Sequence, residues 1–262
     1  MSAEKKETGQ LVDANGIKIY YQSFGSGRPL IFLHGSMGTG QVWKSYVPFL
    51  SKDFNLIFPD VRGHGKTENP GEELALHLMA DDMAALIEAL KLDKPILCGW
   101  SMGGDISLDI AMRYPDHVGG LIVGGVALRD TEAALASLKA MGLDGPGQIN
   151  FERAEKNIPQ LLELWKKDHT QSPLHWKELL KKLSFEMLNP TLPVEDDLKQ
   201  ITAPTLIIWG DRDQFLPVED AVFLYRLIPN AQLAVVPNAD HFVTRTKIPL
   251  FAELVKGFVL SQ

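Results

Sequence analysis

The chain of 262 residues contains a single cysteine, so no disulfide can form within it. This usage fits a reducing compartment, and we predict a cytoplasmic protein. Long apolar runs are missing too, since no stretch approaches the roughly 18 consecutive apolar residues of a membrane helix. The first eight residues are polar and lack the apolar region of a secretory signal. We therefore expect neither a membrane span nor an export signal.

Basic residues are fewer than acidic ones: the chain has 26 Lys and Arg and 33 Asp and Glu, so its formal net charge is -7. Nonspecific nucleic-acid binding needs a basic surface, so we expect no nucleic-acid partner. Hydrophobic residues make up 45% of the chain and charged residues 23%. This balance is typical of a globular protein with a core large enough to need no metal or disulfide.

Short apolar runs recur along the chain. Residues 11–24 alternate apolar and polar positions around Asn15-Gly16, which predicts an antiparallel hairpin with a type I′ turn. Later runs do not alternate, as is typical of parallel strands covered on both faces; they lie at residues 29–33, 54–58, 95–98, 121–123, 205–209 and 233–236. Helical patterns separate them, at residues 77–90, 218–227 and 249–259. This order predicts an α/β fold with a doubly wound, mostly parallel sheet.

The alternation of strands and helices breaks between residues 129 and 200. We find no convincing strand there, only helical patterns at residues 131–141, 151–168 and 173–188. The segment is too long for a loop, because structureless loops beyond about 15 residues are uncommon. We predict that residues 1–128 and 201–262 form the α/β core and that residues 129–200 form a helical cap inserted over the sheet.

The most informative motif is Gly-Trp-Ser-Met-Gly-Gly at residues 99–104. It follows an apolar run and precedes a helical stretch. Between a strand and a helix, the pattern Gly-x-Ser-x-Gly places a nucleophilic serine, here Ser101, at the top of a sheet. We expect Gly99 and Gly103 to be required, because a Cβ at either position would clash where strand and helix cross.

A serine nucleophile needs a base, normally histidine, and a carboxylate that orients the base. On such a sheet the chain order is serine, acid, histidine. Asp211 and Asp213 follow one predicted strand and His241 follows the next, beyond the carboxyl ends where open α/β sheets bind ligands. Asp240 is a poor orienter of its neighbour, because adjacent side chains diverge; we expect it to bond locally. The residues leave Asp211 and Asp213 open as the orienting acid.

Stabilising an oxyanion takes two backbone N–H groups aimed at the developing charge. One is expected from Met102, the residue after the candidate nucleophile. The other is expected from the loop at residues 34–40, which follows the third predicted strand. We assign it to Ser36, with Met37 as the second choice.

Other site types find little support in the sequence. No cluster of His, Cys and Asp has metal-ligand spacing, and we expect no metal and no cofactor. Residues 65–67 (Gly-Lys-Thr) match the end of a phosphate-binding loop, but Asp60 stands where that loop needs glycine and Pro70 interrupts the helix that should follow. Cys98 lies inside an apolar run, so we expect a buried, inert thiol.

The motifs described so far resemble those of the α/β-hydrolase superfamily over roughly residues 10–260. The matching residues are His34-Gly35, Asp-Val-Arg-Gly-His-Gly at 60–65, the segment 99–104, Gly-Asp-Arg-Asp at 210–213 and Asp240-His241. The resemblance is to the small cofactor-free serine hydrolases, which hold esterases, haloperoxidase-like perhydrolases, lactonases and carbon–carbon bond hydrolases.

This resemblance implies that the second aspartate of residues 210–213, Asp213, orients His241, with Asp211 as the second choice. It also implies structural roles for His34 and His64. Asp105 departs from the pattern, because relatives often carry a small or apolar residue after the double glycine.

We expect a serine hydrolase acting on a small-molecule carboxylic ester or similarly activated carbonyl. The pocket candidates are Trp100, Met37 and Trp165. Further aromatic and methionine residues of the insertion either line the pocket or pack the insertion against the sheet. They are Met141, Phe151, Trp176, Phe185 and Met187. The alternatives are a carbon–carbon hydrolase, a lactonase, a perhydrolase, or a non-enzymatic ligand receptor of the same fold. The sequence leaves substrate and oligomeric state open.

Overall fold

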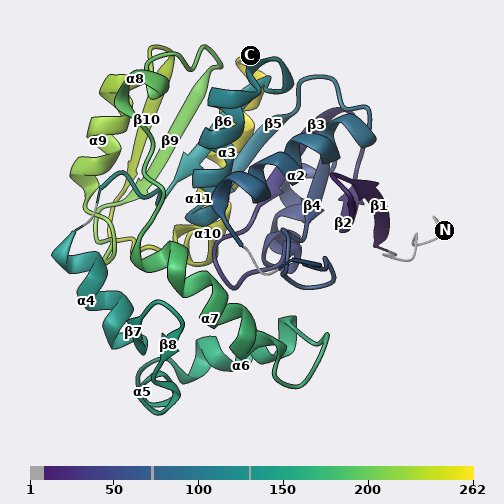
Figure 1. Cartoon of the computed structure of the whole chain (residues 1–262). Helices are drawn as coiled ribbons and strands as arrows, with labels where there is room; N and C mark the ends of the chain where they lie inside the picture. Colours follow the sequence, from purple (N-terminus) through teal and green to yellow (C-terminus); the bar gives the residue numbers. More distant parts are fainter. Residues whose placement is uncertain (1–8, 72–73, 130) are drawn as a thin grey trace.

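The computed structural model describes residues 9–71, 74–129 and 131–262; residues 1–8, for which we predicted no export signal, lie outside this part. The main sheet consists of β1 (Gln10–Ala14), β2 (Ile17–Phe24), β3 (Arg28–Leu33), β4 (Phe54–Pro59), β5 (Ile96–Trp100), β6 (Gly120–Gly124), β9 (Thr205–Gly210) and β10 (Ala231–Val236). Their spatial order is β1-β2-β4-β3-β5-β6-β9-β10 (Figure 1). Strand β2 pairs antiparallel with both β1 and β4, and all other pairs in this sheet are parallel. The predicted α/β class with a mostly parallel sheet is confirmed.

Helices cover both faces of this sheet. One face packs against α2 (Leu76–Ala89), α3 (Met102–Arg113) and α9 (Val218–Leu227), and the other against η1 (Gly40–Tyr46), α1 (Val47–Leu50) and α11 (Ile248–Leu260). Strand β3 shows why its sequence does not alternate, because Ile31 and Leu33 enter the first core whereas Leu30 and Phe32 enter the second. All four side chains are fully buried.

Strands β1 and β2 form the predicted hairpin, with Leu11 opposite Tyr20. The turn residues Asn15 and Gly16 have φ of 47° and 73°, the left-handed conformation that a type I′ turn requires. Asn15 also donates a hydrogen bond from Nδ2 to Oδ1 of Asp82 in α2, at 2.8 Å. This hydrogen bond joins the turn of the hairpin to α2.

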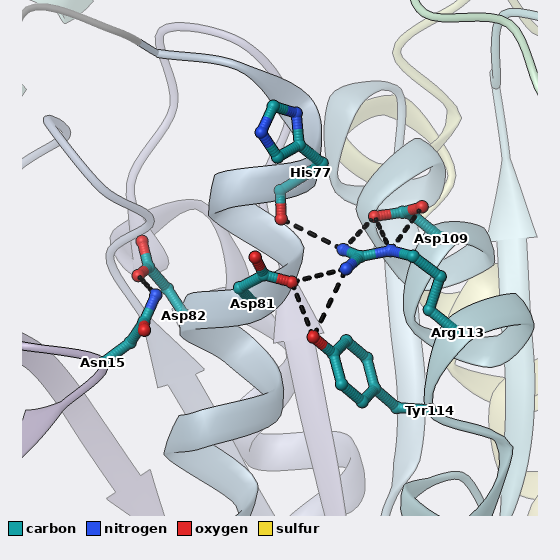
Figure 2. A network of polar contacts seen from close by, with 7 residues as sticks. All are labelled: Asn15, His77, Asp81, Asp82, Asp109, Arg113 and Tyr114. Atoms are coloured by element: carbon teal, nitrogen blue, oxygen red, sulfur yellow. Dashed lines mark hydrogen bonds and ion pairs between the residues drawn. The ribbon is translucent and has the colours of Figure 1, made fainter.

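Polar contacts of Arg113 bind the ends of α2 and α3 together (Figure 2). Its guanidinium donates to Oδ1 of Asp81 at 2.6 Å and to the carbonyl oxygen of His77 at 3.0 Å, both in α2. The same group contacts Asp109 one turn back along α3. The Tyr114 hydroxyl donates to Asp81 at 2.7 Å. This network joins the carboxyl end of α3, the end away from Ser101, to the first turns of α2.

Residues 131–200, called the helical segment below, add no strand to the main sheet. They form α4 (Glu132–Ala140), α5 (Phe151–Asn157), α6 (Pro159–Asp168), α7 (His175–Leu188) and α8 (Glu195–Leu198). Figure 1 shows α4 to α7 gathered beyond one end of the sheet. The division of the chain into a core and an inserted cap stays a prediction.

Two predictions about the helical segment were wrong. The single helix expected over residues 151–168 is two helices, α5 and α6, which meet at Ile158. Pro159 explains the break, because proline disfavours helical geometry in the preceding residue and suits the first helical position. A short hairpin, β7 (Leu143–Gly145) with β8 (Gln148–Ile149), is also present where no strand was expected. Strands of three and two residues are too short to show alternation.

The crossing of β5 and α3 confirms the expected need for small residues. A Cβ at Gly103 would lie 2.1 Å from the carbonyl oxygen of Leu33, and one at Gly99 would lie 2.1 Å from that of Gly103. We expect Gly103→Ala to lower the free energy of unfolding by about 3 kcal/mol, the upper range for overpacking. Urea denaturation followed by circular dichroism measures the change.

The matched control for that substitution is Gly257→Ala. Gly257 lies on the exposed side of α11 and a Cβ there would meet nothing within 4 Å. Alanine should raise stability by up to about 1 kcal/mol through its higher helix propensity. Equal urea midpoints for the two variants would contradict the steric argument.

Candidate active site

Ser101 occupies the tight turn between β5 and α3. Its φ of 55° and ψ of -129° are strained for a residue other than glycine. The turn is held by the Ser101 N–H, which donates to Gly124 O at 2.9 Å, and by Ser101 O, which accepts from Gly104 N at 2.7 Å. Such strain clusters at functional sites because the surrounding structure must sustain it. Ser101 lines a cavity.

His241 and Asp213 form a hydrogen-bonded pair, with Nδ1 2.7 Å from Oδ2. The Asp213 carboxylate is fully buried, and its Oδ1 accepts the N–H groups of Phe215 at 2.9 Å and Leu216 at 3.0 Å. These bonds fix the carboxylate, which in turn orients the imidazole. His241 lines the same cavity as Ser101.

The other two aspartates near His241 have different partners. Asp211 Oδ1 accepts the N–H of Ala239 at 3.1 Å, and Asp240 Oδ1 accepts that of Phe242 at 2.9 Å. The residues left Asp211 and Asp213 open as the orienting acid, and it is Asp213 that lies beside His241. Asp240 bonds locally, in line with the expectation from its position.

The loop after β3 packs directly on the Ser101 turn. A Cβ at Gly35 would lie 3.2 Å from Cβ of Ser101 and 3.3 Å from the Trp100 carbonyl oxygen. Ser36 and Met37 of this loop line the cavity together with Met102. Met102 is the first residue of α3, where backbone N–H groups lack partners within the helix. The residues of the two predicted oxyanion donors, Ser36 and Met102, thus line the same cavity as Ser101.

The cavity has a volume of about 240 Å³ and a mostly apolar lining. All three predicted pocket residues, Trp100, Met37 and Trp165, contribute to it. Apolar residues of the helical segment also line the cavity, among them Leu138, Met141, Leu161, Leu183 and Met187. The remaining candidates do not line the cavity. Phe151 and Trp176 contact each other with ring centroids 5.5 Å apart, and Phe185 is 58% exposed.

Asp105, the departure noted in the sequence, lies on α3 at the wall of this cavity. Its Oδ1 accepts the N–H of Ala127 at 2.9 Å. Burial raises the pKa of Asp105 to about 8, and the charge of nearby Glu186 adds to the shift. The side chain is therefore mostly a neutral carboxylic acid at neutral pH.

Four histidines form a chain of ring contacts beside the site. The centroids are 5.0 Å apart for His34 and His64, 5.7 Å for His64 and His169, and 6.1 Å for His169 and His175. The sequence indicated structural roles for His34 and His64 and did not single out the other two. His169 and His175 come from the helical segment, more than 100 residues further along the chain, and no local motif marks them.

Acid should destabilise the protein through these histidines. Burial lowers the pKa of His34 and His169 to about 4 and that of His64 well below its ordinary value. Below about pH 6.5 the unfolded chain takes up protons at these three sites that the folded chain does not. The free energy of unfolding therefore decreases as the pH is lowered. Asp60 and Asp105 oppose the effect, because burial raises their pKa to about 6 and about 8 and the folded chain retains two protons that the unfolded chain releases.

Between about pH 6.5 and pH 5.5 the three histidines outnumber these two carboxyl groups, so the free energy of unfolding should fall as acid is added. Nearer pH 4, Asp82, Asp168 and Asp220, whose pKa burial also raises, take up protons in the folded chain and reduce the slope. Urea unfolding at about pH 6.5 and pH 5.5 measures the loss. A urea midpoint that stays constant or rises toward acid would contradict it.

In the part of the chain that the structure describes, no helix is long and apolar enough to cross a membrane. The model of the alpha/beta hydrolase fold family matches residues 28–186, more than half of the chain. A relative from Pseudomonas putida, 2-hydroxy-6-oxo-2,4-heptadienoate hydrolase, is 28% identical over the full length of both chains.

Two solved structures extend the comparison. An N-acyl homoserine lactone degrading enzyme is 28% identical with a TM-score of 0.75, covering 95% of this chain and 100% of its own. A thermophilic esterase from Thermogutta terrifontis is 25% identical with a TM-score of 0.76, covering 97% and 98%. The family model matches more than half of the chain, and these relatives align with it over nearly their whole length. The chain therefore belongs to the alpha/beta hydrolase fold family.

Proposed function

We propose that the protein is a serine hydrolase that cleaves a small carboxylic ester or similarly activated carbonyl. Ser101 is the nucleophile, His241 the general base and Asp213 the residue that orients it. One observation carries the proposal: the His241–Asp213 pair, at 2.7 Å, opens on the same cavity as the strained Ser101 turn. In this role the helical segment is the cap of the site, and the single buried thiol, Cys98, suits a cytoplasmic enzyme.

In the first half of the reaction, Ser101 Oγ attacks the carbonyl carbon while its proton passes to His241 Nε2. Asp213 stabilises the resulting imidazolium through Nδ1. The negative charge moves to the carbonyl oxygen, which the N–H groups of Ser36 and Met102 receive. The carbon–oxygen bond to the alcohol then breaks, and His241 gives its proton to the departing oxygen. An acyl group remains on Ser101.

In the second half, water attacks the acyl carbon and His241 takes a proton from it. The bond to Ser101 Oγ breaks, and the proton on His241 returns to that oxygen. The carboxylic acid leaves and the free enzyme is regenerated. No electron is transferred and no group besides water is consumed.

A second candidate is carbon–carbon bond hydrolysis, which the Pseudomonas putida relative supports. The substrate in its name, a hydroxy-oxo-heptadienoate, has no ester bond, so water must break a carbon–carbon bond. We favour the ester because its cleavage needs only the nucleophile, base and orienting acid proposed here, whereas carbon–carbon cleavage also needs a proton delivered to a carbon leaving group. The charged side chains of the cavity do not separate the two candidates, because Arg129 and Arg245 line it together with Glu186.

A fluorophosphonate probe, which phosphonylates activated serines, tests the proposal directly. We expect stoichiometric labelling of Ser101 in the wild type and none in Ser101→Ala. A panel of p-nitrophenyl esters and lactones of increasing acyl length, with one oxo-dienoate, then separates the chemistries. Labelling combined with turnover of the dienoate alone would favour the second candidate, whereas an unlabelled, ligand-binding protein would indicate a receptor.

A further inference from the structure

His169 links the helical segment to the loop that follows β3. The residue caps the carboxyl end of α6 and is 1% exposed. Its Nε2 lies 3.0 Å from the carbonyl oxygen of Met37, and its Nδ1 accepts the backbone N–H of Gly65 at 3.0 Å. Nε2 must therefore carry the proton and donate to Met37 O, because Nδ1 is already an acceptor.

The loop that His169 contacts has an unfavourable backbone conformation. Met37 has φ of 59°, in the left-handed region, and its side chain is 1% exposed. A residue other than glycine keeps this conformation only where its surroundings hold it. Within the core, the loop is held by Gly38 N–H donating to Gly35 O and by His34 Nδ1 at 2.9 Å from the same oxygen. From the helical segment, His169 holds it.

Ser36, which precedes Met37, supplies one of the two N–H groups assigned to the oxyanion. The Ser36 N–H shares its planar peptide group with Gly35 O, which accepts the N–H of Gly38 at 3.0 Å. That Gly38 N–H shares its own peptide group with Met37 O, so a rotation at Met37 disturbs the bond that holds the peptide group of Ser36. The hydrogen bond from His169 to Met37 O resists that rotation. Catalysis is sensitive to such placement, since a displacement of about 1 Å can cost about a hundredfold in rate.

We propose that His169 is a positioning residue through which the seated helical segment orients the Ser36 N–H toward the oxyanion. The inference rests on the proposed function, because it assigns a role in the same reaction. It predicts that the oxyanion site is complete only while α6 is packed against the core. Substrate capture by the cap and readiness for the chemical step are then coupled.

His175 offers the matched comparison. It also belongs to the helical segment and also reaches a core carbonyl, with Nε2 2.9 Å from Gly63 O. Gly63 belongs to the loop after β4 and does not adjoin the oxyanion donors. Loss of the His175 contact should therefore loosen the segment without turning the peptide of Ser36.

The test compares variants of the two histidines in two measurements: the rate of fluorophosphonate labelling at Ser101, and kcat and KM for a p-nitrophenyl ester. We expect His169→Phe to lower labelling rate and kcat at least about tenfold with KM within about twofold. His175→Phe should leave kcat within about twofold while lowering the urea midpoint.

Two amide variants keep the test valid if the phenylalanine variant does not fold. His169→Gln can place an N–H near the position of Nε2 and should recover most of kcat. His169→Asn can only mimic Nδ1 and should remain impaired, although it keeps the bond from Gly65. Equal kcat for these two variants, or equal losses for His169→Phe and His175→Phe, would overturn the inference.

Failure of the proposed function would appear in a different place. A wild type that is neither labelled nor active overturns both proposals. A wild type that is labelled at Ser101 and hydrolyses esters, with His169 variants that behave identically, overturns the positioning role alone.

Discussion

Ser101→Ala should lower kcat for ester hydrolysis by about ten-thousandfold to a millionfold, the range seen when a serine nucleophile is removed. Only Oγ is lost, and no other hydroxyl occupies the turn between β5 and α3. Residual activity then reflects the oxyanion donors and binding alone. The measurement is initial-rate release of p-nitrophenol from the best ester of the panel.

The substitution should leave the fold intact, because alanine meets the same strain at φ of 55° that serine does. Ser101→Gly should even raise stability by about 1 kcal/mol, since glycine adopts this conformation without a Cβ penalty. Ser107→Ala is the matched control: its Oγ donates to Gly103 O at 2.7 Å, so the variant should lose about 1 kcal/mol of stability and keep its kcat. Ester turnover retained by Ser101→Ala would refute the assigned nucleophile.

Much of the fold could be predicted from local patterns. Runs such as residues 29–33 must be covered on both faces, and this alone indicates parallel strands with helices on either side. The positions of Ser101, Asp213 and His241 follow from the same reasoning, because each comes directly after a strand and the carboxyl ends of parallel strands share one edge. That Asp213 rather than Asp211 faces His241 came from a family resemblance, not from a pattern in the residues.

Features set by long-range packing could not be predicted in this way. The roles of His169 and His175 depend on how the helical segment sits on the loops after β3 and β4, and nothing near them in sequence carries that information. The pocket likewise depends on which side of each helix faces the sheet. The sequence left five residues open between lining the pocket and packing the segment, and of these only Met141 and Met187 line the cavity. Asp105 was conspicuous in sequence, but its raised pKa follows from burial that only the structure reveals.

Asp213→Asn should lower kcat by about ten-thousandfold, nearly as much as loss of the nucleophile. An asparagine amide can keep its bonds to Phe215 and Leu216 through its oxygen and then presents its NH₂ group to Nδ1 of His241. Nδ1 becomes an acceptor, so the ring proton moves to Nε2. His241 then has no lone pair facing Ser101 and cannot act as a base, although the geometry is preserved.

The matched control is Asp211→Asn, two residues earlier on the same loop. Asp211 accepts the Ala239 N–H through Oδ1, a role that an asparagine oxygen fills equally well. We expect kcat within about twofold of the wild type, and fluorophosphonate labelling at an undiminished rate. If both asparagine variants lost activity equally, the loop as a whole would be required rather than one carboxylate. If Asp213→Asn kept more than about a tenth of the activity, the orienting role assigned to it through the 2.7 Å contact with His241 would be wrong.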